Sequence, residues 1–160
     1  MGTRFIFGLL ALGALATTAT ALAESVDKFA GDAVMAVFGA PEPMEDHAER
    51  ALRCALAMQQ RQIELNTEAE ESGIPALQMG VGVNTGIVIA GTVGGGGRLE
   101  YTVVGDAVNV AQRLQSEAEG GQVLTTRVTI DASPSVRAEL VGPMHVKGRK
   151  EPVEAHRVLG

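Results

Sequence analysis

The sequence after residue 25 predicts an α+β fold, in which an antiparallel-rich sheet carries helices on one face. Three observations predict it. Segment 26–39 holds two short apolar runs on either side of Gly31 and Asp32, as in a β-hairpin. Segment 46–70 repeats apolar residues at helical spacing. Shorter alternating segments and a second helical pattern follow, so the order of elements is ββ-α-β-β-α-β.

The long helix has recognisable ends in the sequence. Asp46 is expected at the N-cap, and Glu49 follows three residues later, as in a capping box. The apolar residues between Ala48 and Leu65 recur on one face, with charged and amide side chains on the other. Ser72 and Gly73 end the pattern.

The remaining elements are shorter, and their boundaries are set by glycine, proline and changes of period. We expect strands over 77–84, 87–93, 99–104 and 122–126, a helix from Gly105 or Asp106 to Gly120, a helical connection over 129–140 interrupted at Pro134, and a final hairpin of 144–146 with 153–158.

The first twenty-five residues differ in kind from the rest, so we expect a leader over 1–25 and a domain over 26–160. Arg4 provides a positive start, an almost wholly apolar stretch follows it, and Ala21-Leu22-Ala23 has the small-x-small form of a signal-peptidase site. The segment 5–23 is uncharged and long enough to cross a membrane. A secretory signal, a membrane anchor and a leader without a targeting role all fit this pattern.

Composition excludes several functions. The formal net charge of −6 argues against binding a nucleic-acid backbone, and the near absence of aromatic residues removes a stacking surface for bases. Cys54 is the single cysteine, so no internal disulfide forms. The three histidines lack metal-ligand spacing, and no phosphate-binding P-loop is present.

Two stretches with a Gly-Asp pair carry a family resemblance. The first, 27–39, contains Lys28-Phe29-Ala30-Gly31-Asp32, and the second, 101–113, contains Gly105-Asp106-Ala107-Val108-Asn109. Together they resemble the catalytic domain of class III nucleotide cyclases, which form cyclic AMP or cyclic GMP from the triphosphate. The resemblance implies their ferredoxin-like sandwich, here without its first strand and first helix. It extends over about 25–160.

The resemblance implies a role for each of several residues. Asp32 matches a metal-binding aspartate, for Mg²⁺ or Mn²⁺. Lys28 and Thr102 match the two positions that contact the purine base, in a combination that favours ATP. Taken singly, Asp32 also fits a turn residue, Lys28 a solvated charge and Thr102 an ordinary strand residue.

The reacting end of the nucleotide is matched by three further residues. Asn109 matches the asparagine that orients the ribose, and Arg113, four residues later on the same helix face, matches the arginine that stabilises the transition state. Lys147 matches the lysine that binds the terminal phosphates. In this family such sites form between two protomers, so the resemblance also implies a homodimer or pairing with a second cyclase domain.

The family pattern is incomplete at its start. Family members carry a first metal-binding aspartate on the first strand, whereas no acidic residue precedes Glu24 here. Because two-metal catalysis needs both carboxylates, we expect an adenylate cyclase domain that is inactive in this form. The alternatives are a non-catalytic cyclase-like module that binds nucleotide or a partner, and an exported binding protein. Use of ATP implies a cytosolic domain, either cytoplasmic or attached to a membrane through 5–23.

Overall fold

A computed structural model describes residues 4–9, 25–30, 33–40, 42–93 and 100–160. Its strands are β1 (Arg4–Leu9), β2 (Ser25–Ala30), β3 (Ala33–Phe38), β4 (Val81–Asn84), β5 (Ile89–Val93), β6 (Glu100–Val104), β7 (Val123–Thr126), β8 (Ala138–Met144) and β9 (Val153–Val158), and its helices are α2 (His47–Glu71), α3 (Asp106–Glu117) and α4 (Arg127–Asp131).

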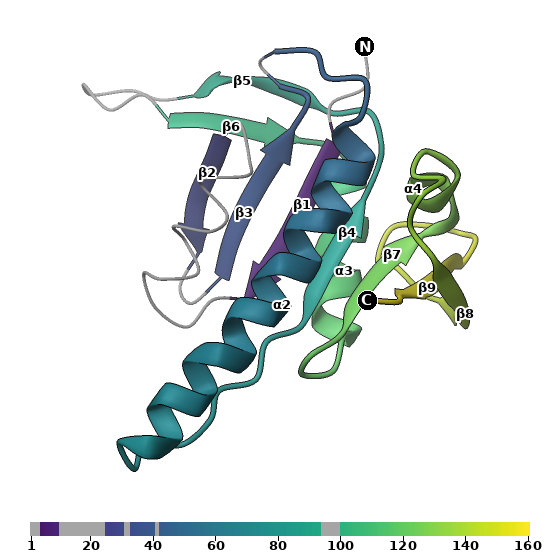
Figure 1. Ribbon diagram of the computed structural model, residues 1–160. Helices are drawn as coiled ribbons and strands as arrows, with labels where there is room; N and C mark the ends of the chain where they lie inside the picture. The colour runs from purple at the N-terminus through teal and green to yellow at the C-terminus, as the bar shows by residue number, and fades with distance from the viewer. Residues whose placement is uncertain (1–3, 10–24, 31–32, 41, 94–99) are drawn as a thin grey trace.

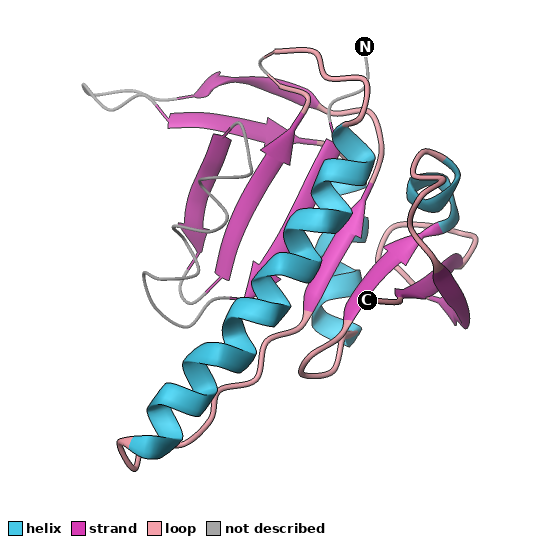
Figure 2. Cartoon of the chain, in the orientation of Figure 1, coloured by secondary structure: helices cyan, strands magenta, loops and turns pink. Residues whose placement is uncertain are grey.

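Seven strands form one sheet in the order β2-β3-β1-β4-β7-β9-β8, and β5 pairs with β6 in a separate two-stranded ribbon (Figures 1 and 2). The pairings of the large sheet are antiparallel except that of β4 with β7. The predicted hairpin is present, because Ala30 at the end of β2 pairs with Ala33 at the start of β3. The α+β class predicted from the sequence is therefore confirmed.

The two long helices cover opposite faces of the sheet, which corrects the expectation of helices on one face. Along β3, Val34, Ala36 and Phe38 pack in the same core as α2, whereas Met35 and Val37 pack with α3. Figure 1 shows α2 in front of the sheet and α3 behind β4. An apolar residue at every position of β3 is the pattern of a strand buried on both faces.

The sheet also has a central first strand, which corrects the expectation that it is lacking. Arg4–Leu9 pairs with β3 on one side and β4 on the other. A short apolar run fits a signal peptide and a buried strand equally well by composition, and periodicity does not separate them. The expected absence of the first helix, and most of the predicted leader, lie outside the described residues. Within the described ranges, no helix has the length and apolar character needed to span a bilayer.

Helix α2 begins after Asp46, as predicted, but the expected capping box is not formed. The Asp46 carboxylate makes no capping hydrogen bond and instead accepts one from Arg50 Nε at 2.8 Å, which lowers the pKa of Asp46. Glu49 pairs with Arg53 at 2.6 Å. Ion pairs between residues four apart in the sequence therefore take the place of the capping hydrogen bonds.

Other boundaries also differ from the sequence expectation, among them the starts of two strands. Strand β4 begins at Val81 rather than at residue 77, and the segment 138–140 belongs to β8 rather than to a helical connection. The helical part of that connection is the single short helix α4. Each difference concerns where an element starts, which sequence patterns locate least well.

Helix α3 lies unusually close to β4, and two glycines permit this approach. A Cβ placed on Gly82 would lie 2.3 Å from the carbonyl oxygen of Ala111 and from the amide nitrogen of Gln115. A Cβ on Gly80 would lie 2.4 Å from the carbonyl oxygen of Ala118. The backbone of α3 therefore rests directly on the backbone of β4, which fixes the height of the helix above the sheet.

We expect Gly82→Ala to lower the free energy of unfolding by about 3 kcal/mol or more, because helix backbone has to move to admit the methyl group. Gly91→Ala is the matched control on strand β5, since nothing lies within 4 Å of a Cβ at that position. Urea denaturation of both variants measures the difference. Equal stability of the two variants would contradict the close seating of α3.

Candidate functional site

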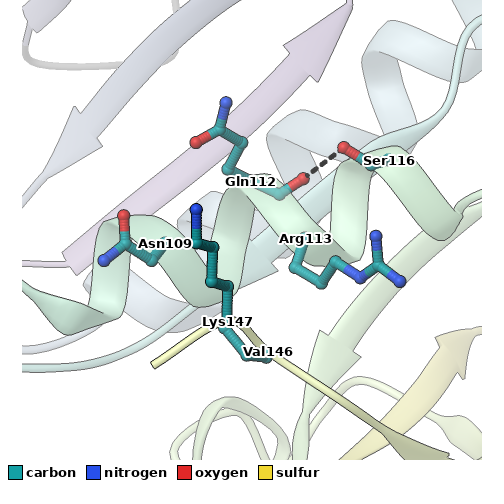
Figure 3. Close-up of a pocket in the computed structure, with 6 residues that line it drawn as sticks. All are labelled: Asn109, Gln112, Arg113, Ser116, Val146 and Lys147. Carbon is teal, nitrogen blue, oxygen red and sulfur yellow. Dashed lines mark hydrogen bonds between the residues drawn. The ribbon is translucent and has the colours of Figure 1, made fainter. Parts of the chain in front are cut away.

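Three of the predicted residues line one surface hollow. Asn109 and Arg113 lie on α3, and Lys147 lies on the loop between β8 and β9 (Figure 3). We call this feature the α3 hollow. Its volume is about 290 Å³, and its described lining residues are Asn109, Gln112, Arg113, Ser116, Val146 and Lys147. These include two cations and no carboxylate, so the hollow favours an anionic ligand.

The two cations of the α3 hollow are oriented differently. Lys147 extends toward the part of α3 that carries Asn109 and Gln112, whereas Arg113 extends away from it (Figure 3). Arg113 Nη2 lies 2.7 Å from a carboxylate oxygen of Glu117, and both side chains are nearly half exposed. Arg113 also lines a second hollow, of about 580 Å³, beside strands β8 and β9. The guanidinium is thus held at the boundary between the two hollows.

The first turn of α3 is fixed by a buried polar side chain. Asn84, at the end of β4, donates from Nδ2 to the carbonyl oxygen of Ala107 at 3.0 Å. Its Oδ1 accepts a hydrogen bond from Thr126 Oγ1 at 2.8 Å. Because both ends of this amide are satisfied within the core, Asn84 ties α3 to β4 and β7. Asn109 lies two residues beyond the anchored Ala107.

The other predicted residues lie in a different region of the chain. Lys28 is on β2, opposite Met35 of β3, and Thr102 is on β6, opposite Gly91 of β5. Strands β2 and β6 are in contact with each other, which brings the two base-contacting candidates onto neighbouring elements. Asp32 lies outside the described residues. The chain therefore carries two groups of candidates, one at the β2 edge of the sheet and one on α3.

The described residues do not form a metal site by themselves. Among them, no three histidine, cysteine or acidic side chains gather closely enough to hold an ion. Cys54 is buried in the core, and burial raises the pKa of its thiol to about 12, so it stays protonated at neutral pH. Of the histidines, His47 contacts the carbonyl oxygen of Glu45 and is buried, as is His156.

The chain is similar to known proteins in both sequence and structure. The sequence model of the adenylate and guanylate cyclase catalytic domain matches residues 17–160. Adenylate cyclase 1 of Rhizobium meliloti is 36% identical over 139 residues, which cover 85% of this chain and 21% of that protein. The chain spans between 21% and 28% of the length of the first curated relatives.

Solved structures agree with the sequence comparison. The adenylyl cyclase CyaB from P. aeruginosa superposes with a TM-score of 0.91 at 25% identity, covering 99% of this chain and 94% of that one. The guanylyl cyclase Cya2 superposes with a TM-score of 0.89 at 30% identity, covering 100% of this chain and 92% of that one. The chain belongs to the adenylate and guanylate cyclase catalytic domain family. Members of this family generally use divalent metal ions.

Sequence reasoning missed the residues that position the site. Asn84 has a recognisable signal, since an amide that closes an apolar strand needs buried hydrogen-bond partners. Asp106 is expected from the sequence only as a possible start of a helix, but its carboxylate also lies 3.3 Å from Arg149 Nε. Glu117 and Arg149 are ordinary surface charges in the sequence, and only the fold reveals their partners.

We expect Glu117→Gln to strengthen the binding of inorganic pyrophosphate by roughly two-fold, because it frees the Arg113 guanidinium from a competing carboxylate. Glu119→Gln is the matched control, since it removes the same charge nearby from a side chain that contacts Gln122. Isothermal titration calorimetry measures both affinities. An equal gain in both variants would mean that net charge, rather than the Arg113 pair, sets the affinity.

Proposed function

We propose that the chain is the catalytic domain of an adenylate cyclase, which converts ATP to 3′,5′-cyclic AMP and pyrophosphate at an interface between two copies. The observation that carries the proposal is the convergence of Asn109, Arg113 and Lys147 on the α3 hollow. Among the described lining residues none is acidic, so no carboxylate there would repel a triphosphate. ATP as substrate implies that the domain lies on the cytosolic side.

The proposed reaction forms a bond between the ribose 3′-oxygen and the α-phosphorus and breaks the bond from that phosphorus to the bridging oxygen. The 3′-hydroxyl proton passes to water, and pyrophosphate leaves. The Asn109 amide orients the ribose so that its 3′-oxygen faces the α-phosphorus in line. Arg113 turns from Glu117 to the α-phosphate, where its charge stabilises the transition state. Lys147 neutralises the leaving pyrophosphate.

We assign recognition of the purine base to Lys28 and Thr102. A lysine donates to N1 of adenine, whereas guanine presents an N1–H donor at the same place, so Lys28 favours ATP over GTP. The solved relatives include both an adenylyl and a guanylyl cyclase, and the backbone alone therefore does not distinguish the two substrates. The contact between β2 and β6 supports a joint role for these two residues.

Dimerisation is supported by exposed apolar side chains on the β5–β6 ribbon. Ile89 and Val104 face each other across the ribbon and are 79% and 63% exposed, and Ile87, just before β5, is 78% exposed. Such a patch is costly to leave in water and suits a second copy of the domain. The family resemblance implies that pairing would bring the metal residue of one copy to Asn109 and Arg113 of the other.

The described residues do not supply the carboxylates that would hold the divalent metal ions of the reaction. Strand β1, the first described strand, contains no carboxylate, and no acidic residue occurs in 1–23. For this reason we propose that the chain by itself forms little cyclic AMP, with Mg²⁺ or Mn²⁺ bound weakly at Asp32. The same observation favours a second candidate function, a non-catalytic module that binds nucleotide or regulates a partner cyclase.

A substitution in β1 distinguishes the catalytic domain from the non-catalytic module. Leu9 pairs with Ala33, so Leu9→Asp adds a carboxylate on β1 at the position opposite the residue that follows Asp32 in the sequence. With Mn²⁺-ATP we expect negligible cyclic AMP from the natural chain and measurable cyclic AMP from Leu9→Asp. Leu9→Asn is the matched control and should stay inactive. A folded Leu9→Asp protein without activity would support the non-catalytic module.

Mixing variants tests the composite site. In the Leu9→Asp background, Asp32→Ala and Arg113→Ala should each lower turnover by about 10²-fold or more. Equal mixing should restore about a quarter of the activity, because half of the dimers are mixed and each holds one intact site. The control is a chain carrying both substitutions, mixed with itself. Absence of recovery would contradict a site shared between two copies.

A further inference from the structure

We propose that Arg149 is a positioning residue, which holds Lys147 at the α3 hollow through its ion pair with Asp106 on the first turn of α3. The proposal rests on the proposed function for the role of Lys147 as a phosphate-binding cation. The position of the loop relative to α3, however, is a property of the unliganded chain. The proposal can therefore be tested both with and without a ligand.

Lys147 lies in a tight turn. The backbone N–H of Arg149 donates to the carbonyl oxygen of Val146 at 3.1 Å, which closes a four-residue turn. Gly148 has a φ of 90°, in the left-handed region, as the third position of a type II turn requires. Lys147 is thus the second residue of the turn, and its backbone direction is set by the residues on either side.

Both ends of this turn are attached to α3. Val146 is buried in a cluster that includes Val110 and Leu114 of the helix. At the other end, Arg149 Nε lies 3.3 Å from a carboxylate oxygen of Asp106, the first residue of α3. The apolar contact and the ion pair lie on the same helix as Asn109 and Arg113. The turn therefore has a fixed place along α3, and Lys147 projects between its two attachments.

The ion pair also sets which cation is available to a ligand. Lys147, Arg149 and Lys150 are close together in the chain and repel one another. Asp106 neutralises Arg149 and is favourably placed at a helix N-terminus. Lys147 then remains as the loop cation that lines the α3 hollow. Loss of the pair would release the end of the turn and let the Lys147 side chain leave the hollow.

Hydrogen exchange tests the attachment without a ligand. By NMR, Arg149→Gln and Asp106→Asn should each speed exchange of the amide of residue 149 by roughly two- to five-fold, the range of a partly exposed ion pair. The exchanged pair, Asp106→Arg with Arg149→Asp, should restore protection. Lys150→Gln is the matched control and should leave the exchange rate unchanged. Unchanged exchange in Arg149→Gln, or no restoration in the exchanged pair, would overturn the proposal.

Ligand binding tests the consequence for Lys147. Calorimetry with inorganic tripolyphosphate at fixed ionic strength should show Arg149→Gln weakening affinity roughly two- to five-fold more than Lys150→Gln, which removes the same charge. In the Asp106→Asn background, Arg149→Gln and Lys150→Gln should weaken the affinity for tripolyphosphate equally. A larger effect of Arg149→Gln in that background would mean that Arg149 binds phosphate directly, which overturns the proposal. No binding of ATP or tripolyphosphate by the natural chain would refute the proposed function, and the exchange rates would still decide the inference.

Discussion

The backbone contact between β4 and α3 is the constraint on which the candidate site depends. There is no room for a side chain at Gly80 or Gly82 beneath the helix. The distance between α3 and the sheet is therefore fixed. Asn84 then fixes the start of the helix, which sets its rotation. With height and rotation fixed, Asn109 and Arg113 lie on the exposed side of α3, facing the loop that carries Lys147. A looser helix would carry the same residues without a defined geometry.

The fold was largely predictable because its elements have strong local patterns. The β2–β3 hairpin, α2 and the start of α3 follow from periodicity and from the Gly-Asp turns. Two features were not predictable. Burial of both sheet faces depends on long-range packing of Met35 and Val37 with α3. The assignment of Arg4–Leu9 as a strand depends on its partners β3 and β4, since its composition fits an exported leader as well.

The candidate site was predictable where residues share one element or one motif. Asn109 and Arg113 are four residues apart on a helix, and Lys147 lies in a short hairpin loop, so the family pattern predicts a role for each. Their convergence on one hollow is a result of the fold. The partners of these residues were not predictable, because Glu117, Asp106 and Arg149 act through ion pairs that a sequence does not specify. The role of a charged surface residue can be inferred only after its oppositely charged partner has been located in the fold.

The central place of β1 has a consequence for how this chain is made. Strand β1 leaves the ribosome before either of its neighbours, and Phe5 pairs with Asn84 only after the residues between them have been synthesised. Until then the edge of β1 that pairs with β4 stays unpaired, and an unpaired apolar strand edge binds chaperones or other nascent chains. Such distant pairing also makes folding slow, because a long loop has to close before the contact is gained. Strand β1 is thus made before both of its neighbours and is complete in its pairing only after β4 has formed.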